Sequence, residues 1–387
     1  MPKVLTGLDV LQQNKFQALN AYRVGVLCHQ ASVNRTLQHL LQLMQMAKVN
    51  VTAIFGPEHG LWGTAQDQIE IPGSSGAGHV VVHSLYGDHR APTLAELDDI
   101  DVMVCDLQDV GSRYYTFIWT MALALQMCAK AKKPFFVLDR PNPLGGKILE
   151  GPVLDLHFAS FVGLYAMPVQ HGMTIGEIAQ WINGVYKIGA DLRVISMHGW
   201  KRSMDFSATR LPWVAPSPNM PTLETARVYP GGCLIEGTLL SEGRGTTRPF
   251  EFVGAPYIQP EVLAGALNAE KLPDVYFRAC RFEPTFHKFK NELCGGVQVH
   301  VTGSAFEPFV TYLLLIQTIR YLYPENFAWR SPPYEYEKEK LPFDILCGAD
   351  TVRLALEAGE DLRVLAKTWT PGLAQFRRQR APFLLYN

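Results

Sequence analysis

Glu58 and His59 stand where a largely apolar stretch of the chain ends abruptly. The stretch runs from Val49 to Phe55, is rich in β-branched residues, and stops at Gly56-Pro57. A buried strand that ends in a turn with titratable side chains is how α/β enzymes place catalytic groups at the carboxyl edge of a sheet. We therefore predict that Glu58 is a general acid or base. For His59 taken alone, the alternative is a structural role: a turn histidine whose hydrogen bonds are satisfied by its neighbours.

Three further loops that follow predicted strands carry chemically active residues. They are Cys28-His29-Gln30, residues 106–115 and residues 139–143. If the strands are parallel, all these loops lie at one edge of the sheet and converge on one crevice. The alternatives are structural: Asp106 and Asp139 can cap the helix or turn that follows, and Arg140 can pair with either of them. Cys28 and His29 point to opposite faces of a strand, which disfavours a thiolate nucleophile activated by its neighbour.

The second half of the chain adds polar groups on turns and glycine-rich loops. His171-Gly172 precedes a predicted helix, a rigid turn at residues 216–221 contains Asn219, and the segment 242–248 contains Glu242 and Arg244. Arginine together with backbone amides suits a ligand that bears a carboxylate. The alternative for this segment is a solvated loop with ordinary ion pairs.

Several kinds of chemistry lack their sequence motifs. The chain contains no H-E-x-x-H and no G-x-S-x-G, and neither G-x-G-x-x-G nor G-x-x-x-x-G-K-[ST] follows a predicted strand. These absences disfavour zinc-peptidase, serine-esterase and nucleotide-binding sites. The glycine-rich segment 73–78 precedes a strand, so we expect a surface loop there. We therefore expect neither a metal nor a cofactor.

The elements that must position these residues alternate between strand and helix in the first part of the chain. Predicted strands cover residues 23–28, 49–55, 80–85, 101–107 and 135–138, and predicted helices cover residues 37–46, 94–97 and 116–132. This alternation, with continuous apolar strands, predicts an α/β fold with a mostly parallel sheet covered on both faces.

The pattern changes after about residue 150, which predicts a second, smaller α+β domain. We expect helices over residues 174–186, 309–322, 349–358 and 361–376, strands over 192–197, 275–282 and 296–302, and an irregular stretch over 213–260. The predicted domains are residues 1–155 and 156–387. A long irregular stretch inside a compact protein is usually functional.

The composition excludes some classes of partner. The net charge is −1, and 48% hydrophobic with 18% charged residues is typical of a globular protein. No basic surface for nucleic acid is indicated, and no apolar stretch reaches the ~20 residues that span a bilayer. The seven cysteines are widely spaced, and several of them lie in apolar runs and are expected to be small buried hydrophobes. No signal peptide is visible, so we expect a cytoplasmic protein as encoded, or a periplasmic or secreted one if a signal segment has been removed.

A series of ordered sequence blocks resembles a known family. The blocks cover residues 55–60, 84–87, 106–117, 138–146, 150–153, 168–174, 216–222 and 229–248. Together they are similar to the bacterial exo-β-N-acetylmuramidases, peptidoglycan hexosaminidases that remove N-acetylmuramic acid from non-reducing ends. Residues 28–31, Cys-His-Gln-Ala, depart from the Thr-Asn-Gln-Thr expected there, which would alter a subsite wall. The resemblance implies a Rossmann-like first domain, a smaller C-terminal domain, an active site in the cleft between them, and Glu58 as the catalytic glutamate.

This resemblance implies roles for the remaining candidate residues. Glu58 would be the general acid/base with His59 or Tyr114 as tuning neighbours. A second carboxylate, Asp106 or Asp109, would orient the substrate acetamido group or attack directly. The lactyl carboxylate of the sugar would meet Arg113, Arg140 or Arg244, in that order of preference. Further substrate contacts are expected from Gln30, Asn142, His171, Asn219 and Glu242. The alternatives are a non-catalytic sugar-binding protein and a hydrolase of a phosphorylated small molecule that uses Asp106 and Asp139.

Overall fold

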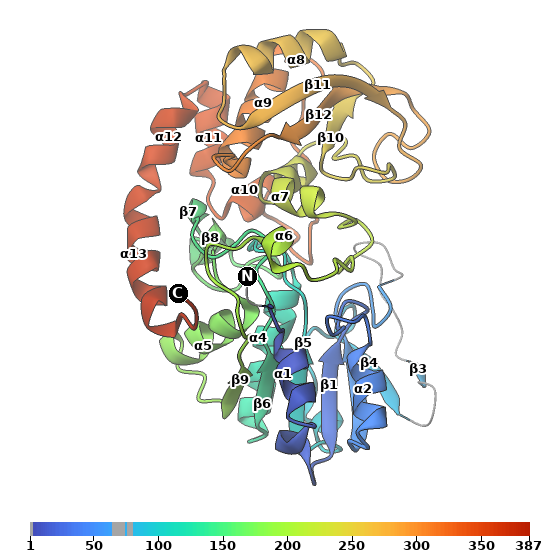
Figure 1. Ribbon diagram of the computed structural model, residues 1–387. Helices are drawn as coiled ribbons and strands as arrows, with labels where there is room; N and C mark the ends of the chain where they lie inside the picture. The colour runs from blue at the N-terminus through green and yellow to red at the C-terminus, as the bar shows by residue number, and fades with distance from the viewer. Residues whose placement is uncertain (1–2, 64–73, 76–79) are drawn as a thin grey trace.

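A seven-stranded sheet forms the first part of the molecule (Figure 1). The computed structural model describes residues 3–63, 74–75 and 80–387. The strand order is β3-β4-β2-β1-β5-β6-β9, and all neighbouring pairs are parallel except β3 with β4. The strands are β1 (Val24–Cys28), β2 (Val51–Gly56), β3 (Ser74–Ser75), β4 (Val81–Ser84), β5 (Val102–Asp106), β6 (Phe135–Leu138) and β9 (Leu192–Ile195). The predicted α/β fold is confirmed. Most of the segment 73–78 lies outside the described residues.

Helices cover both faces of this sheet, as continuous apolar strands require. Alternate residues of one strand pack on opposite faces: Val26 joins the apolar cluster with α1 and α2, whereas Leu27 joins the cluster with α4 and α5. The helices of this part are α1 (Gly7–Gln13), α2 (Leu40–Met46), α3 (Leu94–Leu97), α4 (Phe117–Lys130) and α5 (Ile175–Val185). In the register of the parallel strands Cys28 is opposite Asp106 and Leu27 is opposite Phe55. The loops after β1, β2 and β5 therefore leave the sheet at one edge.

The first sheet extends further along the sequence than residue 155. Strand β9 pairs with β6, with Phe135 opposite Leu192 and Leu138 opposite Ile195. Helix α5 packs on the same two strands. Both elements fall within the segment assigned to the second domain from the sequence. We therefore place the junction between the two parts near residue 225, after β9 and before the second sheet.

The second part is built on a three-stranded antiparallel sheet with the order β10-β12-β11. Its strands are β10 (Phe252–Ala255), β11 (Val275–Phe282) and β12 (Cys294–Val301), and its main helices are α8 (Pro260–Ala269), α9 (Pro308–Leu322), α10 (Pro342–Cys347), α11 (Thr351–Ala358), α12 (Leu362–Thr368) and α13 (Thr370–Arg380). The smaller α+β domain expected from the sequence is thus present. The predicted helix 361–376 is two helices that meet near Trp369.

The stretch 213–260 is not irregular as predicted. It contains α7 (Leu223–Gly232), the 3-10 turn Cys233–Gly237 and β10. The Thr222 hydroxyl caps α7 by accepting a hydrogen bond from the Thr225 amide at 3.2 Å. Pro230 lies inside the helix, although proline usually ends one. Gly231 is required there, because a Cβ at this position would lie 2.1 Å from the Pro308 carbonyl oxygen of α9.

Short elements and the C-terminal segment join the two parts. A hairpin of β7 (Glu150–Val153) and β8 (Pro168–Gln170) and the short helix α6 (Phe206–Thr209) lie between them. Helices α12 and α13 run from the second part back to the first, and the chain ends near α5 (Figure 1). There the Tyr386 hydroxyl bonds to the Asp139 carboxylate, which also accepts from Thr174 and the Gly176 amide. Burial raises the pKa of Asp139 to about 7.

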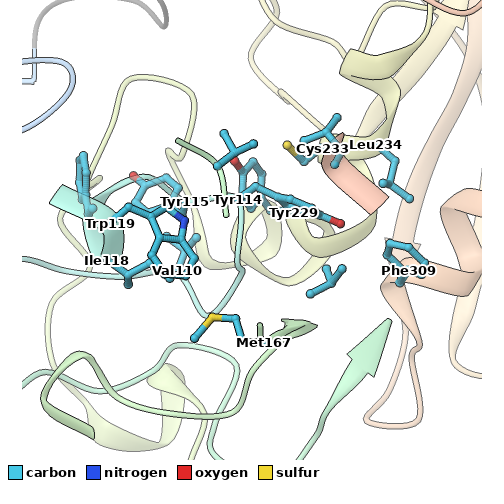
Figure 2. Packing of buried hydrophobic residues seen from close by; sticks show 14 of the residues in the cluster. Val110, Tyr114, Tyr115, Ile118, Trp119, Met167, Tyr229, Cys233, Leu234 and Phe309 are labelled. Carbon is cyan, nitrogen blue, oxygen red and sulfur yellow. The ribbon is translucent and has the colours of Figure 1, made fainter. Parts of the chain in front are cut away.

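The apolar core is continuous across the two parts. Figure 2 shows this packing, in which Ile118 and Trp119 of the first part share one cluster with Leu234 and Phe309 of the second. All seven cysteines are buried and unpaired, so the burial expected of several of them extends to the whole set. Among the described residues no helix is both long and apolar enough to cross a membrane.

Candidate active site

A cavity between the two parts collects the residue expected to be catalytic and several others. The loops after β2 and β5 supply Glu58, His59, Tyr114, Tyr115 and Thr116. The opposite walls come from four segments: residues 217–220, α7 with the following 3-10 turn, the loop before β10, and residues 334–335. Their lining residues are Ser217, Asn219, Met220, Tyr229, Glu236, Arg244, Phe250, Tyr334 and Glu335, with Val162 at one side.

Glu58 is held at the carboxyl end of β2, two residues after the strand ends at Gly56. Its side chain is only 5% exposed, and Oε2 accepts a hydrogen bond of 2.6 Å from the Thr116 hydroxyl at the start of α4. The tight turn is completed by His59, whose φ is 69°, and by Gly60, whose φ is 77°. A buried carboxylate fixed by a neighbouring donor in a cavity has the setting of a general acid/base.

Three tyrosines form an aromatic wall beside Glu58. The rings of Tyr114 and Tyr115 both meet that of Tyr229 edge to face, with centroids 6.2 and 5.9 Å apart, and Figure 2 shows the three residues together. The Tyr114 hydroxyl donates to the Pro230 carbonyl oxygen at 3.1 Å. Burial raises the pKa of all three phenols well above the usual value. The wall therefore presents neutral aromatic surface, which suits a sugar ring.

Arg244 supplies positive charge to the cavity from a buried ionic cluster. Its Nη2 lies 2.7 Å from Glu236 Oε1, and its Nε lies 3.5 Å from Glu242 Oε1. Glu242 also contacts Lys288 at 2.9 Å and His287 at 3.1 Å. Burial alone would raise the pKa of Glu242, but Lys288, His287 and Arg244 together hold it well below the usual value. Glu242 is thus surrounded by three basic side chains and holds Arg244 in place.

Gln30 and its neighbour His29 shape the cavity indirectly, by holding the turn that carries Ser217. The Gln30 amide donates to the carbonyls of Ala215 and Pro216 at 2.8 and 2.9 Å. The Gln108 backbone N–H donates to His29 Nε2 at 3.0 Å, which leaves the proton on Nδ1, 3.3 Å from the Pro216 carbonyl oxygen. Burial lowers the pKa of His29, so the ring is neutral. In this structure Gln30, one of the expected substrate contacts, is bound to the turn through its side-chain nitrogen.

Asp106 and Arg140 bind each other rather than facing the cavity. Nε and Nη2 of Arg140 lie 2.5 and 2.8 Å from the two carboxylate oxygens of Asp106, and both side chains are almost fully buried. Neither residue lines the cavity. The bidentate pair matches the structural alternative considered for these residues and leaves Asp106 poorly placed to act as the second carboxylate.

Asp109, Asn142 and His171 form a support behind the cavity wall. His171 Nε2 lies 3.3 Å from Asp109 Oδ2, which also accepts from the Gly111 amide at 2.8 Å. The Met173 amide donates to His171 Nδ1, and the Asn142 side chain donates to the Met173 carbonyl at 2.9 Å. These contacts join the loops after β5, β6 and β8. None of the three residues is among those that line the cavity.

Arg113, the preferred candidate for the lactyl contact, points away from the cavity. It is fully buried and donates to the carbonyl oxygens of Pro152, Met167 and Leu346 at 3.0, 2.9 and 2.7 Å. Of the three candidate arginines only Arg244 lines the cavity. Arg244, placed last among the three from the sequence, is thus the candidate that the structure brings to the cavity.

Several cavity residues were not selected from the sequence. Thr116 and Tyr115 belong to the loop after β5, whose richness in polar and aromatic residues was the available signal. Glu335 and Tyr334 come from a short segment near the C-terminus that has no strand-end signature. Tyr86, just after β4, donates to Glu335 Oε2 at 3.3 Å and so connects this segment to the first part.

Family models match nearly the whole chain. The one described as exo-beta-N-acetylmuramidase NamZ, N-terminal, matches residues 24–224, and the corresponding C-terminal one matches residues 227–386. The chain belongs to the exo-β-N-acetylmuramidase NamZ family. The family resemblance seen in the sequence blocks is thereby confirmed, and the two matches meet near the junction that we place at residue 225.

Individual relatives agree with the family over the full length of the chain. The peptidoglycan beta-N-acetylmuramidase NamZ of Bacillus subtilis is 45% identical over 389 aligned residues, which cover 100% of this chain and 92% of the relative. Two crystal structures of DUF1343 family proteins from Bacteroides fragilis have the same fold. They align with TM-scores of 0.90 and 0.78 at 33% and 28% identity, covering 100% of this chain and 99% of each of theirs.

Proposed function

We propose that this protein is a glycoside hydrolase that releases N-acetylmuramic acid from the non-reducing end of peptidoglycan fragments, with Glu58 as general acid/base. The enzyme class follows from the family and from 45% identity to a peptidoglycan beta-N-acetylmuramidase. The observation that supports the role of Glu58 is its position: a buried carboxylate, bonded to Thr116, in a cavity walled by tyrosines.

The cavity offers the groups that cleavage of a muramic acid glycoside needs. A carboxylic acid must protonate the glycosidic oxygen while positive charge develops at the anomeric carbon. Glu58 provides this acid, and the aromatic wall formed by Tyr114, Tyr115 and Tyr229 gives the sugar ring apolar surface. Arg244 provides the cation for the lactyl carboxylate, because its guanidinium is fixed by Glu236 and Glu242 and reaches the cavity.

The alternative of a phosphate hydrolase acting through Asp106 and Asp139 is disfavoured by the contacts of these two residues. Asp106 is bound to Arg140, and Asp139 accepts hydrogen bonds from Thr174, Gly176 and Tyr386. Both aspartates therefore stabilise the fold.

Product analysis with a peptide-free disaccharide tests the proposal. The purified protein is incubated with N-acetylmuramyl-β-1,4-N-acetylglucosamine, with the reversed disaccharide as the control substrate. We expect free N-acetylmuramic acid from the first substrate and no cleavage of the second. Measurable binding without cleavage would instead support a sugar-binding protein, and an unchanged disaccharide together with magnesium-dependent hydrolysis of a phosphorylated substrate would favour the phosphate hydrolase.

A further inference from the structure

A tight turn in the second part of the molecule brings a second carboxylate to the cavity. The backbones of Tyr334 and Glu337 exchange two hydrogen bonds of 2.9 Å, and Glu335 and Tyr336 are the two residues between them. Both have left-handed backbones, with φ of 46° and 70°. Two-residue turns with positive φ at both positions strongly favour Asn and Gly. A turn that keeps glutamate and tyrosine there is strained, and such strain is concentrated at functional sites.

Contacts on both sides hold this turn rigidly. The Tyr334 hydroxyl donates to Glu236 Oε2 at 2.7 Å, within the cluster that fixes Arg244. On the other side the Tyr336 ring packs edge to face against Tyr86 at 5.6 Å, with the Arg90 guanidinium 4.6 Å from the same ring. Glu335 itself is only 8% exposed and lines the cavity.

Tyr86 lies close enough to both Glu335 and Glu58 to feel their charges. Its hydroxyl donates to Glu335 Oε2 at 3.3 Å. Burial raises the pKa of Tyr86, and the negative charges of Glu58 and Glu335 raise it further. Both carboxylates therefore act on the same phenol, one from the loop after β2 and the other from the turn 334–337. The two parts of the molecule each contribute one acid to the same cavity.

The third acid at the cavity, Glu236, uses both of its carboxylate oxygens in structural contacts. Among the described residues that line it, the acids are Glu58, Glu236 and Glu335. Glu236 uses Oε1 for Arg244 and Oε2 for the Tyr334 hydroxyl. The two aspartates expected to serve as the second carboxylate, Asp106 and Asp109, do not line it.

We propose that Glu335 is the second catalytic carboxylate, the anion that stabilises the positive charge of the transition state while Glu58 protonates the leaving oxygen. This inference rests on the proposed function. As the bond from C1 to the glycosidic oxygen breaks, its electron pair stays with that oxygen, which takes the proton of Glu58. The positive charge spreads over C1 and the ring oxygen, and onto the amide when the acetamido oxygen bonds to C1. Water then adds to C1 and gives its proton back to Glu58; where the acetamido oxygen has bonded to C1, that bond breaks in the same step and its electron pair returns to the amide.

Substitutions at Glu335 separate this role from that of Glu58. Glu335→Gln keeps the size and removes the charge, and Glu335→Asn places a residue that tolerates positive φ. Glu339→Gln is the matched control, since Glu339 is exposed and lies on the same segment. Turnover is measured on the muramyl disaccharide and on 4-nitrophenyl β-N-acetylmuramide, whose leaving group needs no protonation, and folding is followed by thermal unfolding.

We expect Glu335→Gln and Glu335→Asn to lower kcat by ~100-fold or more on both substrates, on the scale of a lost transition-state contact. Glu335→Asn should unfold at the wild-type temperature or above it, because the turn is relieved. Glu58→Gln should lose more activity on the disaccharide than on the nitrophenyl substrate, and Glu339→Gln should equal the wild type.

A Glu335→Gln enzyme within about threefold of wild-type kcat would overturn the inference, with threefold being far below the effect of a lost charge-stabilising group. A loss confined to the disaccharide would also overturn it, because Glu335 would then be assisting the acid. Wild-type protein that cleaves neither substrate would contradict the proposed function itself. An active wild type together with an active Glu335→Gln variant contradicts this inference alone.

Discussion

Replacing Arg113 by methionine should destabilise the fold and leave substrate preference unchanged. The guanidinium is fully buried and donates one hydrogen bond each to the carbonyls of Pro152 in β7, Met167 just before β8, and Leu346 in α10. The outermost of these carbonyls, those of Pro152 and Leu346, are nearly 200 positions apart in the sequence. Arg113 therefore acts as a connector between the two parts of the molecule.

The size of the effect follows from the carbonyl groups of Pro152 and Leu346, which lose this donor, because the Met167 carbonyl still accepts from the Leu154 amide at 3.1 Å. A buried acceptor left without a partner costs about 1–3 kcal/mol. Removing a buried charge recovers part of that loss, since a guanidinium is costly to desolvate. We therefore expect a net decrease of roughly 3–5 kcal/mol in the free energy of unfolding, a large share of the ~5–15 kcal/mol typical of a native domain.

Urea denaturation measures this decrease, and steady-state kinetics on the folded variant measure substrate preference. Arg281→Met is the matched control, because Arg281 is 57% exposed on its side chain and forms a surface ion pair with Glu261 at 3.4 Å. Such pairs contribute about 0–1 kcal/mol. The ratio of kcat/KM for a muramide over a glucosaminide should stay at the wild-type value in both variants.

The opposite pattern would refute this reasoning. If Arg113→Met unfolds at the wild-type urea concentration and loses kcat/KM on the muramide alone, Arg113 binds the lactyl group, as the sequence first led us to expect. The structural role assigned to its three hydrogen bonds would then be wrong.

Three further predictions concern the cavity and its surroundings. Arg244→Gln should weaken the muramide more than the glucosaminide, by ~10-fold or more in KM, because a charge-assisted contact is worth roughly 1.5–3 kcal/mol; equal weakening would argue against a lactyl contact. Thr116→Val should lower turnover by ~10-fold on the same scale without changing thermal stability, and unchanged turnover would mean that the bond to Glu58 is dispensable. Burial raises the pKa of Glu150 from 4.5 in the unfolded chain to about 8 in the fold. The stabilisation from its buried, protonated carboxyl is complete below pH 4.5 and is lost as the pH rises through about 8. Glu150→Gln should therefore gain stability over wild type between pH 5 and 8.5 in urea titrations, and parallel pH profiles of the two proteins would contradict this.

The position of Glu58 could be predicted because it depends on local sequence. An apolar strand followed by Gly56-Pro57 fixes where the chain turns, and a parallel sheet fixes the edge at which the turn lies. The same reasoning located the loops after β1, β5 and β6. It could not tell which side chains of those loops enter the cavity, because the direction of each depends on partners far away in the sequence. The Arg113 side chain donates hydrogen bonds to carbonyls of three distant segments, and the Asp106 side chain forms an ion pair with Arg140.

The helix α7 was missed because its sequence contains Pro230, Gly231 and Gly232, which normally end helices. Tertiary packing overrides this tendency: Gly231 lets α7 approach α9 at the Pro308 carbonyl more closely than any side chain would allow. The capping hydroxyl of Thr222 was the one local signal for the start of this helix.

Glu335 could not be predicted as a site residue from the sequence, for a different reason. Its turn carries none of the residues that normally mark a two-residue hairpin, and it follows no buried strand. Only the folded chain brings it beside Tyr86, 249 positions earlier in the sequence. When a site lies between two parts of a molecule, the sequence predicts only those of its residues that follow strands of the regular parallel sheet.

Turnover of the Glu58→Gln variant tests the central claim most directly. Glutamine keeps the size of the side chain and its contact with Thr116 but cannot donate and recover a proton. With the muramyl disaccharide as substrate and Glu339→Gln as the matched control, we predict that release of N-acetylmuramic acid falls by ~100-fold or more, the scale of a lost acid/base group. Thermal unfolding should be unchanged. Near-normal release from a folded Glu58→Gln protein would contradict the assignment of Glu58 as the general acid/base.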